Sequence, residues 1–189
     1  MRQDQSHCRR TGLLALLLAV ACGQPAPEVG GEASSSAVSV ADVEALGVPN
    51  AAMPVRNLLT AGQPTEEQFA ALVDMGYTNF VSLRVATENG AGWEESHVMD
   101  EGIAFSRIPV AGAEGLTREN VEALDRILDE AGSENTVLYC ASSNRVGGLL
   151  ALRAYWLDGA SSEEALALGR EAGLRSLEGA VSELMGEPR

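Results

Sequence analysis

The chain has 189 residues, 46% of them apolar and 21% charged, a length that suits one well-cored domain and is short for two. Its 27 acidic residues outnumber its 13 basic ones, which are all arginine, and the formal net charge is −14. We therefore expect no nucleic acid partner and no docking on anionic lipid through a basic patch. Without lysine, Schiff-base chemistry and a nucleotide-binding P-loop are also excluded.

Residues 1–22 are typical of a bacterial lipoprotein signal peptide. Three arginines precede the apolar stretch Leu13–Val20, which is too short to span a bilayer. Small residues then lead to Cys22, which such signals leave as the lipid-bearing N-terminus. We expect an exported protein that is attached to the membrane only through lipid on Cys22 and faces the periplasm. An ordinary export signal, giving a soluble periplasmic or secreted protein, is the alternative.

Residues 23–50 are rich in Pro, Gly, Ser, Ala and Glu, and the composition indicates a flexible linker, with one helical turn at Asp42–Leu46. The folded domain is expected over residues 51–189. Cys8 would leave with the signal and Cys22 would carry lipid, so Cys140 would be the single free thiol in an oxidising compartment.

Strand and helix patterns alternate along the domain. Strands are predicted at Val55–Leu59, Tyr77–Leu83, Ile103–Val110 and Thr136–Tyr139; helices are predicted after the capping residues Thr65, Thr117 and Ser161, and over Trp93–Glu101, Val146–Leu157 and Arg175–Met185. This alternation predicts an α/β fold with a mostly parallel central sheet and helices on both faces. In such a sheet, ligands bind outside the carboxyl ends of the strands. Arg84, the loop 111–116 and the loop after Cys140 all lie at such ends.

The stretch Cys140–Arg145 carries the chemistry that we expect. A buried strand ends on Cys140, four small or polar residues follow, and Arg145 precedes an apolar helix. If this loop curls, its backbone N–H groups and the first turn of the helix point at one place, where they can bind an oxyanion. The same positive field would stabilise a thiolate on Cys140. A buried structural cysteine is the alternative.

The loop Cys140–Arg145 resembles the signature loop of the cysteine-dependent tyrosine and dual-specificity phosphatases. Together with Gly62-Gln63-Pro64, the strand end at Arg84 and Ile108-Pro109-Val110, it is similar to a small bacterial branch described as phosphatase-like or sulfurtransferase-like. The resemblance implies a phosphatase-like three-layer architecture. One feature departs from most phosphatases: four residues, not five, separate Cys140 from Arg145, and this spacing is also that of rhodanese loops.

The resemblance implies hydrolysis of a phosphate monoester, on a protein or a small molecule, through a phosphocysteine intermediate. Cys140 would be the nucleophile and Arg145 the phosphate ligand, while an acid in the loop 111–116 would protonate the leaving group, where Glu114 is the one candidate. The substrate would be bound by the loop backbone and by a sheet-end arginine, that is, by Ala141, Ser142, Ser143, Asn144 and Arg84. No metal or cofactor is expected.

Two other functions stay open from the sequence. A rhodanese-like sulfurtransferase would carry sulfur as a persulfide on Cys140, a smaller ligand that suits the shorter loop. A non-catalytic module would use the same loop to bind an anion or a partner protein. With His97 as the one histidine after the signal, a Ser-His-Asp hydrolase is not expected.

Overall fold

The computed structural model describes residues 39–98 and 102–186, so the predictions for the signal peptide and for most of the linker lie outside the described residues. The centre is a five-stranded sheet in the order β1-β2-β5-β3-β4. The strands are β1 (Ala52–Val55), β2 (Leu58–Ala61), β3 (Asn79–Ser82), β4 (Ala104–Arg107) and β5 (Thr136–Tyr139). All neighbouring pairs are parallel except β1 and β2. The predicted α/β fold with a mostly parallel sheet is confirmed.

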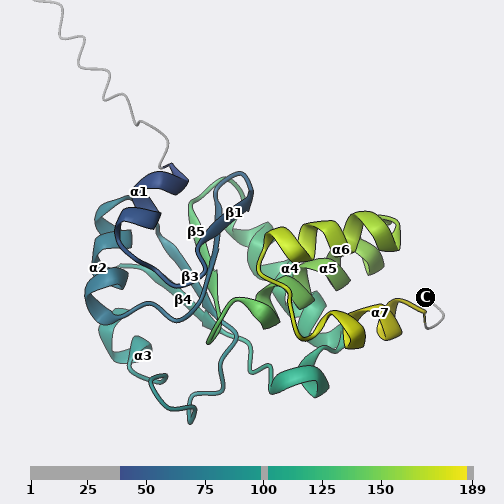
Figure 1. The fold of residues 1–189 in the computed structure, drawn as a ribbon. Helices are drawn as coiled ribbons and strands as arrows, with labels where there is room; N and C mark the ends of the chain where they lie inside the picture. Colours follow the sequence, from purple (N-terminus) through teal and green to yellow (C-terminus); the bar gives the residue numbers. More distant parts are fainter. Residues whose placement is uncertain (1–38, 99–101, 187–189) are drawn as a thin grey trace, which may run out of the picture. The chain divides into compact units, whose positions relative to one another are not determined.

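Helices cover both faces of this sheet (Figure 1). One face carries α1 (Val40–Ala45), α2 (Glu66–Asp74) and α3 (Glu94–His97). The other carries α4 (Arg118–Ala131), α5 (Asn144–Trp156), α6 (Ser162–Glu171) and α7 (Glu178–Gly186). The predicted three-layer architecture is therefore present, with α5 buried between the sheet and its neighbouring helices.

Alternation along β5 separates the two halves of the core. Val137 and Tyr139 pack with α1 and α2, whereas Leu138 and Cys140 pack with the α4–α7 layer. All four are at most 1% exposed. Because successive strand residues face opposite sides of a sheet, the residue that ends β5 is delivered into the layer that contains α5.

The first predicted strand was placed wrongly. Val55–Leu59 is not one strand but contains the turn of an antiparallel hairpin, in which Val55 pairs with Leu58. Asn57 adopts a left-handed backbone with φ 63°, which Asn tolerates better than most residues. Parallel pairing therefore begins with β2, beside β5.

The packed chain begins before residue 51. Ser39 caps α1 through a capping box, and Val43 and Val48 are buried against Phe69 and Phe80 in the core under α2. The end of the range 23–50, predicted as a linker, is therefore part of the folded unit. The side chains of Val43 and Val48 explain why this part of the predicted linker is folded, because packing against the core removes their apolar surface from water.

Gly147, near the start of α5, permits a close contact with the next helix. A Cβ at Gly147 would collide with the backbone of Gly169 and Leu174. The missing side chain thus lets α6 and the segment after it lie directly against α5.

Candidate active site

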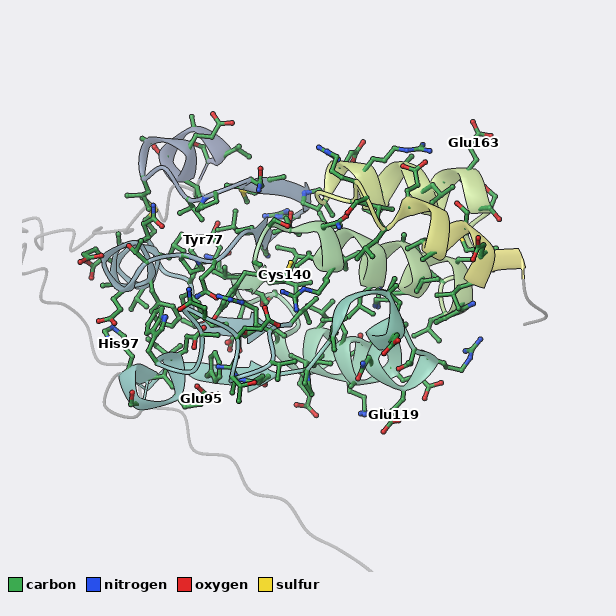
Figure 2. The ribbon with its side chains drawn as sticks, turned by 60° about the horizontal axis from the view of Figure 1, so that its bottom comes forward. Tyr77, Glu95, His97, Glu119, Cys140 and Glu163 are labelled. Atoms are coloured by element: carbon green, nitrogen blue, oxygen red, sulfur yellow. The ribbon has the colours of Figure 1, made fainter. Side chains whose placement is uncertain are left out.

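Strand β5 ends at Tyr139, and Cys140 follows as the first residue of a tight loop. The Cys140 side chain is 1% exposed and lies in the interior of the domain (Figure 2). Its backbone N–H donates to Ala61 (3.3 Å), and Gln63 N–H donates to the Ala141 carbonyl (3.4 Å). The loop is therefore held against the end of β2, as the predicted strand-loop-helix arrangement requires.

Ser143 forms the corner between this loop and α5. It has a left-handed backbone with φ 64°, a conformation that is uncommon for a residue with a side chain. Its hydroxyl donates to the Ala172 carbonyl (2.7 Å) and makes no capping hydrogen bond to α5. Because a helix cannot pair its first N–H groups internally, the first turn of α5 keeps N–H donors that can bind an oxyanion.

Asn144 fixes the segment after α6 rather than contacting the loop. Its side-chain oxygen accepts from the backbone N–H groups of Arg175 (2.7 Å) and Leu177 (3.4 Å), and its amide donates to Ser176 (2.8 Å). Substrate binding by Ala141, Ser142, Ser143 and Asn144 was predicted for their backbone N–H groups. The side-chain contacts of Asn144 do not test this role, which stays a prediction.

The Arg145 guanidinium lies under the ends of β3 and β4. Nη1 and Nη2 donate to the two carboxylate oxygens of Glu88 at 2.7 and 2.9 Å, and Nη1 also donates to the Val110 carbonyl at 2.8 Å. The Glu88 carboxylate raises the pKa of Arg145, burial opposes this, and the nearby Cys140 sulfur adds to the increase. Arg145 and Cys140, predicted to act together, are thus neighbours.

Arg145 keeps one edge of its fork available. An arginine has five N–H donors, and the contacts to Glu88 and Val110 use three of them on Nη1 and Nη2. Nε–H and the second Nη2–H share the other edge, and no oxygen in residues 39–98 and 102–186 accepts a hydrogen bond from them. Two parallel donors on one edge suit bidentate binding of a tetrahedral oxyanion.

Glu88 is held by more than Arg145. Arg84 Nε donates to its carboxylate at 3.0 Å, and the Val85 backbone N–H donates at 2.9 Å. Hydrogen bonds from Arg145, opposed by burial and helped by Val85 and Arg84, lower the pKa of Glu88 to about 2. Glu88 is therefore a carboxylate at neutral pH and a fixed counter-charge for both arginines.

Arg84 was predicted to contact substrate, but its contacts are within the protein. It is 6% exposed, and besides Glu88 it donates to the Gln63 side chain (3.0 Å) and to the Asn89 carbonyl (2.7 Å). The structure thus pairs this sheet-end arginine with a carboxylate. Its role in substrate binding stays a prediction.

Gln63 joins this group to a second, fully buried carboxylate, Glu94. Gln63 Nε2 donates to Glu94 at 3.1 Å, as do the Tyr139 hydroxyl at 3.1 Å and Arg107 Nη2 at 3.0 Å. Burial opposes ionisation of Glu94, but hydrogen bonds from its own backbone N–H, from Gln63 and Arg107 and from the Gly92 N–H outweigh it, and the pKa of Glu94 lies below its usual value. The chain of contacts Arg145–Glu88–Arg84–Gln63–Glu94 thus runs from the Cys140 loop into the opposite half of the core.

Glu114 lies in a short 3₁₀ helix, Gly112–Gly115, at the predicted position after β4. It is exposed and lines a cavity with Trp156 and Leu184. The residues on either side of this helix lie near the start of α5, since Val110 accepts from Arg145 at 2.8 Å and a Cβ at Gly148 would lie 3.1 Å from Leu116. No hydrogen bond or ion pair joins Glu114 to Cys140 or Arg145 within residues 39–98 and 102–186, and the general-acid role of Glu114 stays a prediction.

Reasoning from the sequence missed Glu88, Gln63 and Glu94. Glu88 lies in a turn rich in Gly and Asn, where a carboxylate is usually solvated, and its partner Arg145 is 57 positions away. From the sequence, Gln63 is recognisable only as part of the Gly62-Gln63-Pro64 motif, which assigns it no contact. Its position at the end of β2, beside β5, is the signal that could have placed it next to the Cys140 loop.

Residues 39–98 and 102–186 contain no helix that is long and apolar enough to cross a membrane. They also contain no group of three or more His, Cys, Asp and Glu side chains placed to hold a metal ion.

No family model and no curated protein matches the sequence, but solved structures match the fold. A protein of Shewanella putrefaciens, described as a "putative phosphatase (DUF442)", superposes with a TM-score of 0.61 at 19% identity over 78% of this chain and 97% of that chain. A second protein with the description "putative phosphatase", from Neisseria meningitidis, gives 0.59 at 18% identity over 71% and 96%.

A third match is P. aeruginosa TpbA, solved in complex with phosphotyrosine, with a TM-score of 0.52 at 15% identity over 69% of this chain and 77% of that chain. Identities this low establish architecture rather than activity. The strand order, the loop after β5 and these superpositions lead to one conclusion. The chain has the fold of the cysteine-dependent tyrosine and dual-specificity phosphatases.

Proposed function

We propose that the protein is a cysteine-dependent phosphatase that hydrolyses a phosphate monoester. The observation that carries this proposal is the edge of the Arg145 guanidinium that binds no oxygen of the described residues, together with the interaction of this guanidinium with the Cys140 sulfur and the uncapped first turn of α5. A phosphoryl group placed there would meet two guanidinium donors and the backbone N–H groups of the loop. Fixed donors of this kind stabilise the charge that develops in the transition state.

The reaction has two steps. The Cys140 thiolate attacks phosphorus, a sulfur–phosphorus bond forms, and the bond to the ester oxygen breaks; the leaving oxygen takes a proton from an acid. Water then attacks the phosphocysteine, the sulfur–phosphorus bond breaks, and inorganic phosphate leaves with the thiolate restored. Glu114, in the 3₁₀ helix that follows the Val110 contact of Arg145, remains our prediction for the acid.

A second candidate is transfer of sulfane sulfur, which the four-residue spacing between Cys140 and Arg145 favours. The Cys140 thiolate would attack the outer sulfur of thiosulfate, forming a persulfide and releasing sulfite. Cyanide would then take that sulfur as thiocyanate and restore the thiolate. The same loop N–H groups would bind the persulfide.

One experiment separates these functions and the non-catalytic module. Two assays are run on the wild type and on Cys140→Ser. The first measures release of p-nitrophenol from p-nitrophenyl phosphate, with and without vanadate. The second measures formation of thiocyanate from thiosulfate and cyanide. We expect vanadate-sensitive phosphate release that the substitution abolishes, and no thiocyanate. Thiocyanate without phosphate release would support the sulfurtransferase. Activity that survives in Cys140→Ser would overturn both enzymes, and no activity with retained binding of inorganic phosphate would leave the binding module.

We further propose that the protein is exported and held at the membrane through lipid on Cys22, facing the periplasm. The support is the sequence pattern of residues 1–22. Intact mass measurement of the mature protein tests this proposal. A mature N-terminus at another residue, or one without lipid, would overturn it.

A further inference from the structure

A cavity of about 330 Å³ lies beside the Cys140 loop, on the side of β1 and α6. Its walls come from three parts of the chain: Ser142 and Asn144 of the loop, the segment 50–52 that leads into β1, and the segment 171–176 that follows α6. In the sheet, β1 and the pair β3 and β4 lie on opposite sides of β5. The cavity is thus across the loop from the Glu88 contacts of Arg145.

The walls are tied together by hydrogen bonds. The Asn50 side chain donates to the Ser142 carbonyl at 3.2 Å, and Asn144 holds Arg175 and Ser176. Gly173 has φ 103°, and a Cβ there would collide with Ser143. The segment after α6 is therefore seated directly against the loop, and the cavity is formed before any ligand binds.

The lining is polar and lacks aromatic side chains. Apart from Asn144 and Ser176, which bond to each other, its polar side chains are those of Asn50, Ser142, Glu171 and Arg175, and the remaining lining residues are two alanines and a glycine. Within the described residues the Glu171 carboxylate has no hydrogen bond or ion pair, and Arg175 uses only Nη1, on the carbonyls of Arg170 and Leu174. One acceptor and one donor group are thus free at the same cavity.

The polar lining of the cavity favours a hydroxylated leaving group over an aromatic one. A phenyl ring gains from aromatic or extended apolar walls, whereas the apolar part of this lining is limited to two alanines and a glycine. An aliphatic hydroxyl can donate to a carboxylate and accept from a guanidinium, so a hydroxylated chain or ring satisfies both Glu171 and Arg175. The volume is at the lower end of that of small-molecule sites, which favours a small ester over a folded phosphoprotein.

We propose that the cavity binds the alcohol part of a small, hydroxylated phosphate monoester, such as a sugar or polyol phosphate, and that Glu171 and Arg175 determine this specificity. The proposal rests on the phosphatase function above and names its substrate class. Glu171 accepts from a hydroxyl of the alcohol and Arg175 donates to one, while the phosphoryl group lies at Cys140 and Arg145.

The test compares kcat/KM for glucose 6-phosphate, glycerol 1-phosphate and phosphotyrosine in the wild type, Glu171→Gln and Arg175→Gln. Hydrogen bonds to charged groups are worth about 10- to 100-fold in binding. We expect each substitution to lower kcat/KM for the two polyol esters by about that factor, mostly through KM, and to change the value for phosphotyrosine by less than about threefold. Glu163→Gln is the matched control, since Glu163 is exposed at the opposite end of α6 (Figure 2).

Two results overturn the proposal while leaving the phosphatase in place. One is a wild-type preference for phosphotyrosine by about tenfold or more. The other is an equal effect of both substitutions on all three esters, because a merely structural role would act on every substrate alike. If no ester releases phosphate in a Cys140-dependent way, the phosphatase function itself fails, and the substrate class with it.

Discussion

The two sides of the Cys140 loop differ in how their polar groups are paired. Toward β3 and β4, Arg145 binds Glu88, Glu88 binds Arg84, and Arg84 binds Gln63, so each charged group has a fixed partner. Toward β1 and α6, the charged side chains that border the cavity, Glu171 and Arg175, keep free donors and acceptors. We refer to these as the paired side and the open side. The difference indicates that one side fixes the reacting geometry and the other receives the variable part of the substrate.

The largest expected effect is on the paired side, from Arg145→Lys. Lysine keeps the charge but lacks the planar fork that binds Glu88 with one edge and an oxyanion with the other. Removing one such fixed donor costs about 10²–10³ in kcat. We expect a loss of at least about 10² in kcat for p-nitrophenyl phosphate, measured under saturating substrate. A variant with wild-type kcat would show that the guanidinium does not contact the phosphoryl group.

Glu88→Gln is the next test of the paired side. The amide cannot offer two anionic oxygens to Arg145, so the guanidinium loses its fixed orientation, and a displacement of about 1 Å can cost about 10²-fold in rate. We expect kcat to fall by about 10- to 100-fold. Glu134→Gln, another carboxylate that is hydrogen-bonded but far from the loop, is the control.

The pH dependence of stability in Glu88→Gln is a second test of the paired side. The pKa of Glu88 falls from 4.5 to about 2 on folding. A depressed carboxyl pKa stabilises the folded state above pH 4.5, and this contribution is lost as pH falls toward 2; it is at most about 3 kcal/mol. Thermal unfolding from pH 7 to pH 2 should show a smaller loss of Tm in Glu88→Gln than in the wild type. Parallel curves would mean that Glu88 is not held by Arg145 in solution.

Much of the fold and part of the site can be predicted from sequence because the signals are local. Val137, Leu138 and Tyr139 form a short hydrophobic run, and Cys140 and Arg145 follow within one short loop, so neighbouring residues suffice to place them. Gln63 and Glu88 come from other loops, and only the pairing of β2 and β3 with β5 brings Gln63 to the Cys140 loop and Glu88 to Arg145. Their partners cannot be identified before the sheet order is known.

The β1–β2 hairpin and α1 show a second reason why parts of the fold could not be predicted from the sequence. Asn57 permits a tight turn between Val55 and Leu58, and neither turn residue, Arg56 or Asn57, is the glycine or proline that would indicate that the chain reverses there. Val43 and Val48 are isolated apolar residues next to a polar segment, and they become core only because α2 and the sheet leave a surface for them. Both features depend on tertiary packing that outweighs local composition.

Asn144→Ala tests whether the open side is formed in advance. The Asn144 side chain accepts two hydrogen bonds from the segment after α6 and donates one to it, and these partners are mostly exposed, so water can replace part of what is lost. We expect the free energy of unfolding to fall by about 1–2 kcal/mol. KM for polyol esters should rise more than kcat falls, because Arg145 keeps its contacts with Glu88. A fall in kcat without a change in KM would contradict the division into two sides.

The smallest effects compare two buried tyrosines on the same face of the sheet. The Tyr139 hydroxyl donates to Glu94 within the paired side, whereas the Tyr77 hydroxyl is buried without a hydrogen-bond partner among the described residues. We expect Tyr139→Phe to lower the free energy of unfolding by about 1 kcal/mol, since Glu94 keeps its other donors. Tyr77→Phe should leave stability unchanged or raise it slightly, because it removes a polar group whose burial is uncompensated. Urea unfolding of the two variants measures both. If both substitutions cost the same, packing around the rings, rather than the polar network that begins at Arg145, sets the stability of this half of the core.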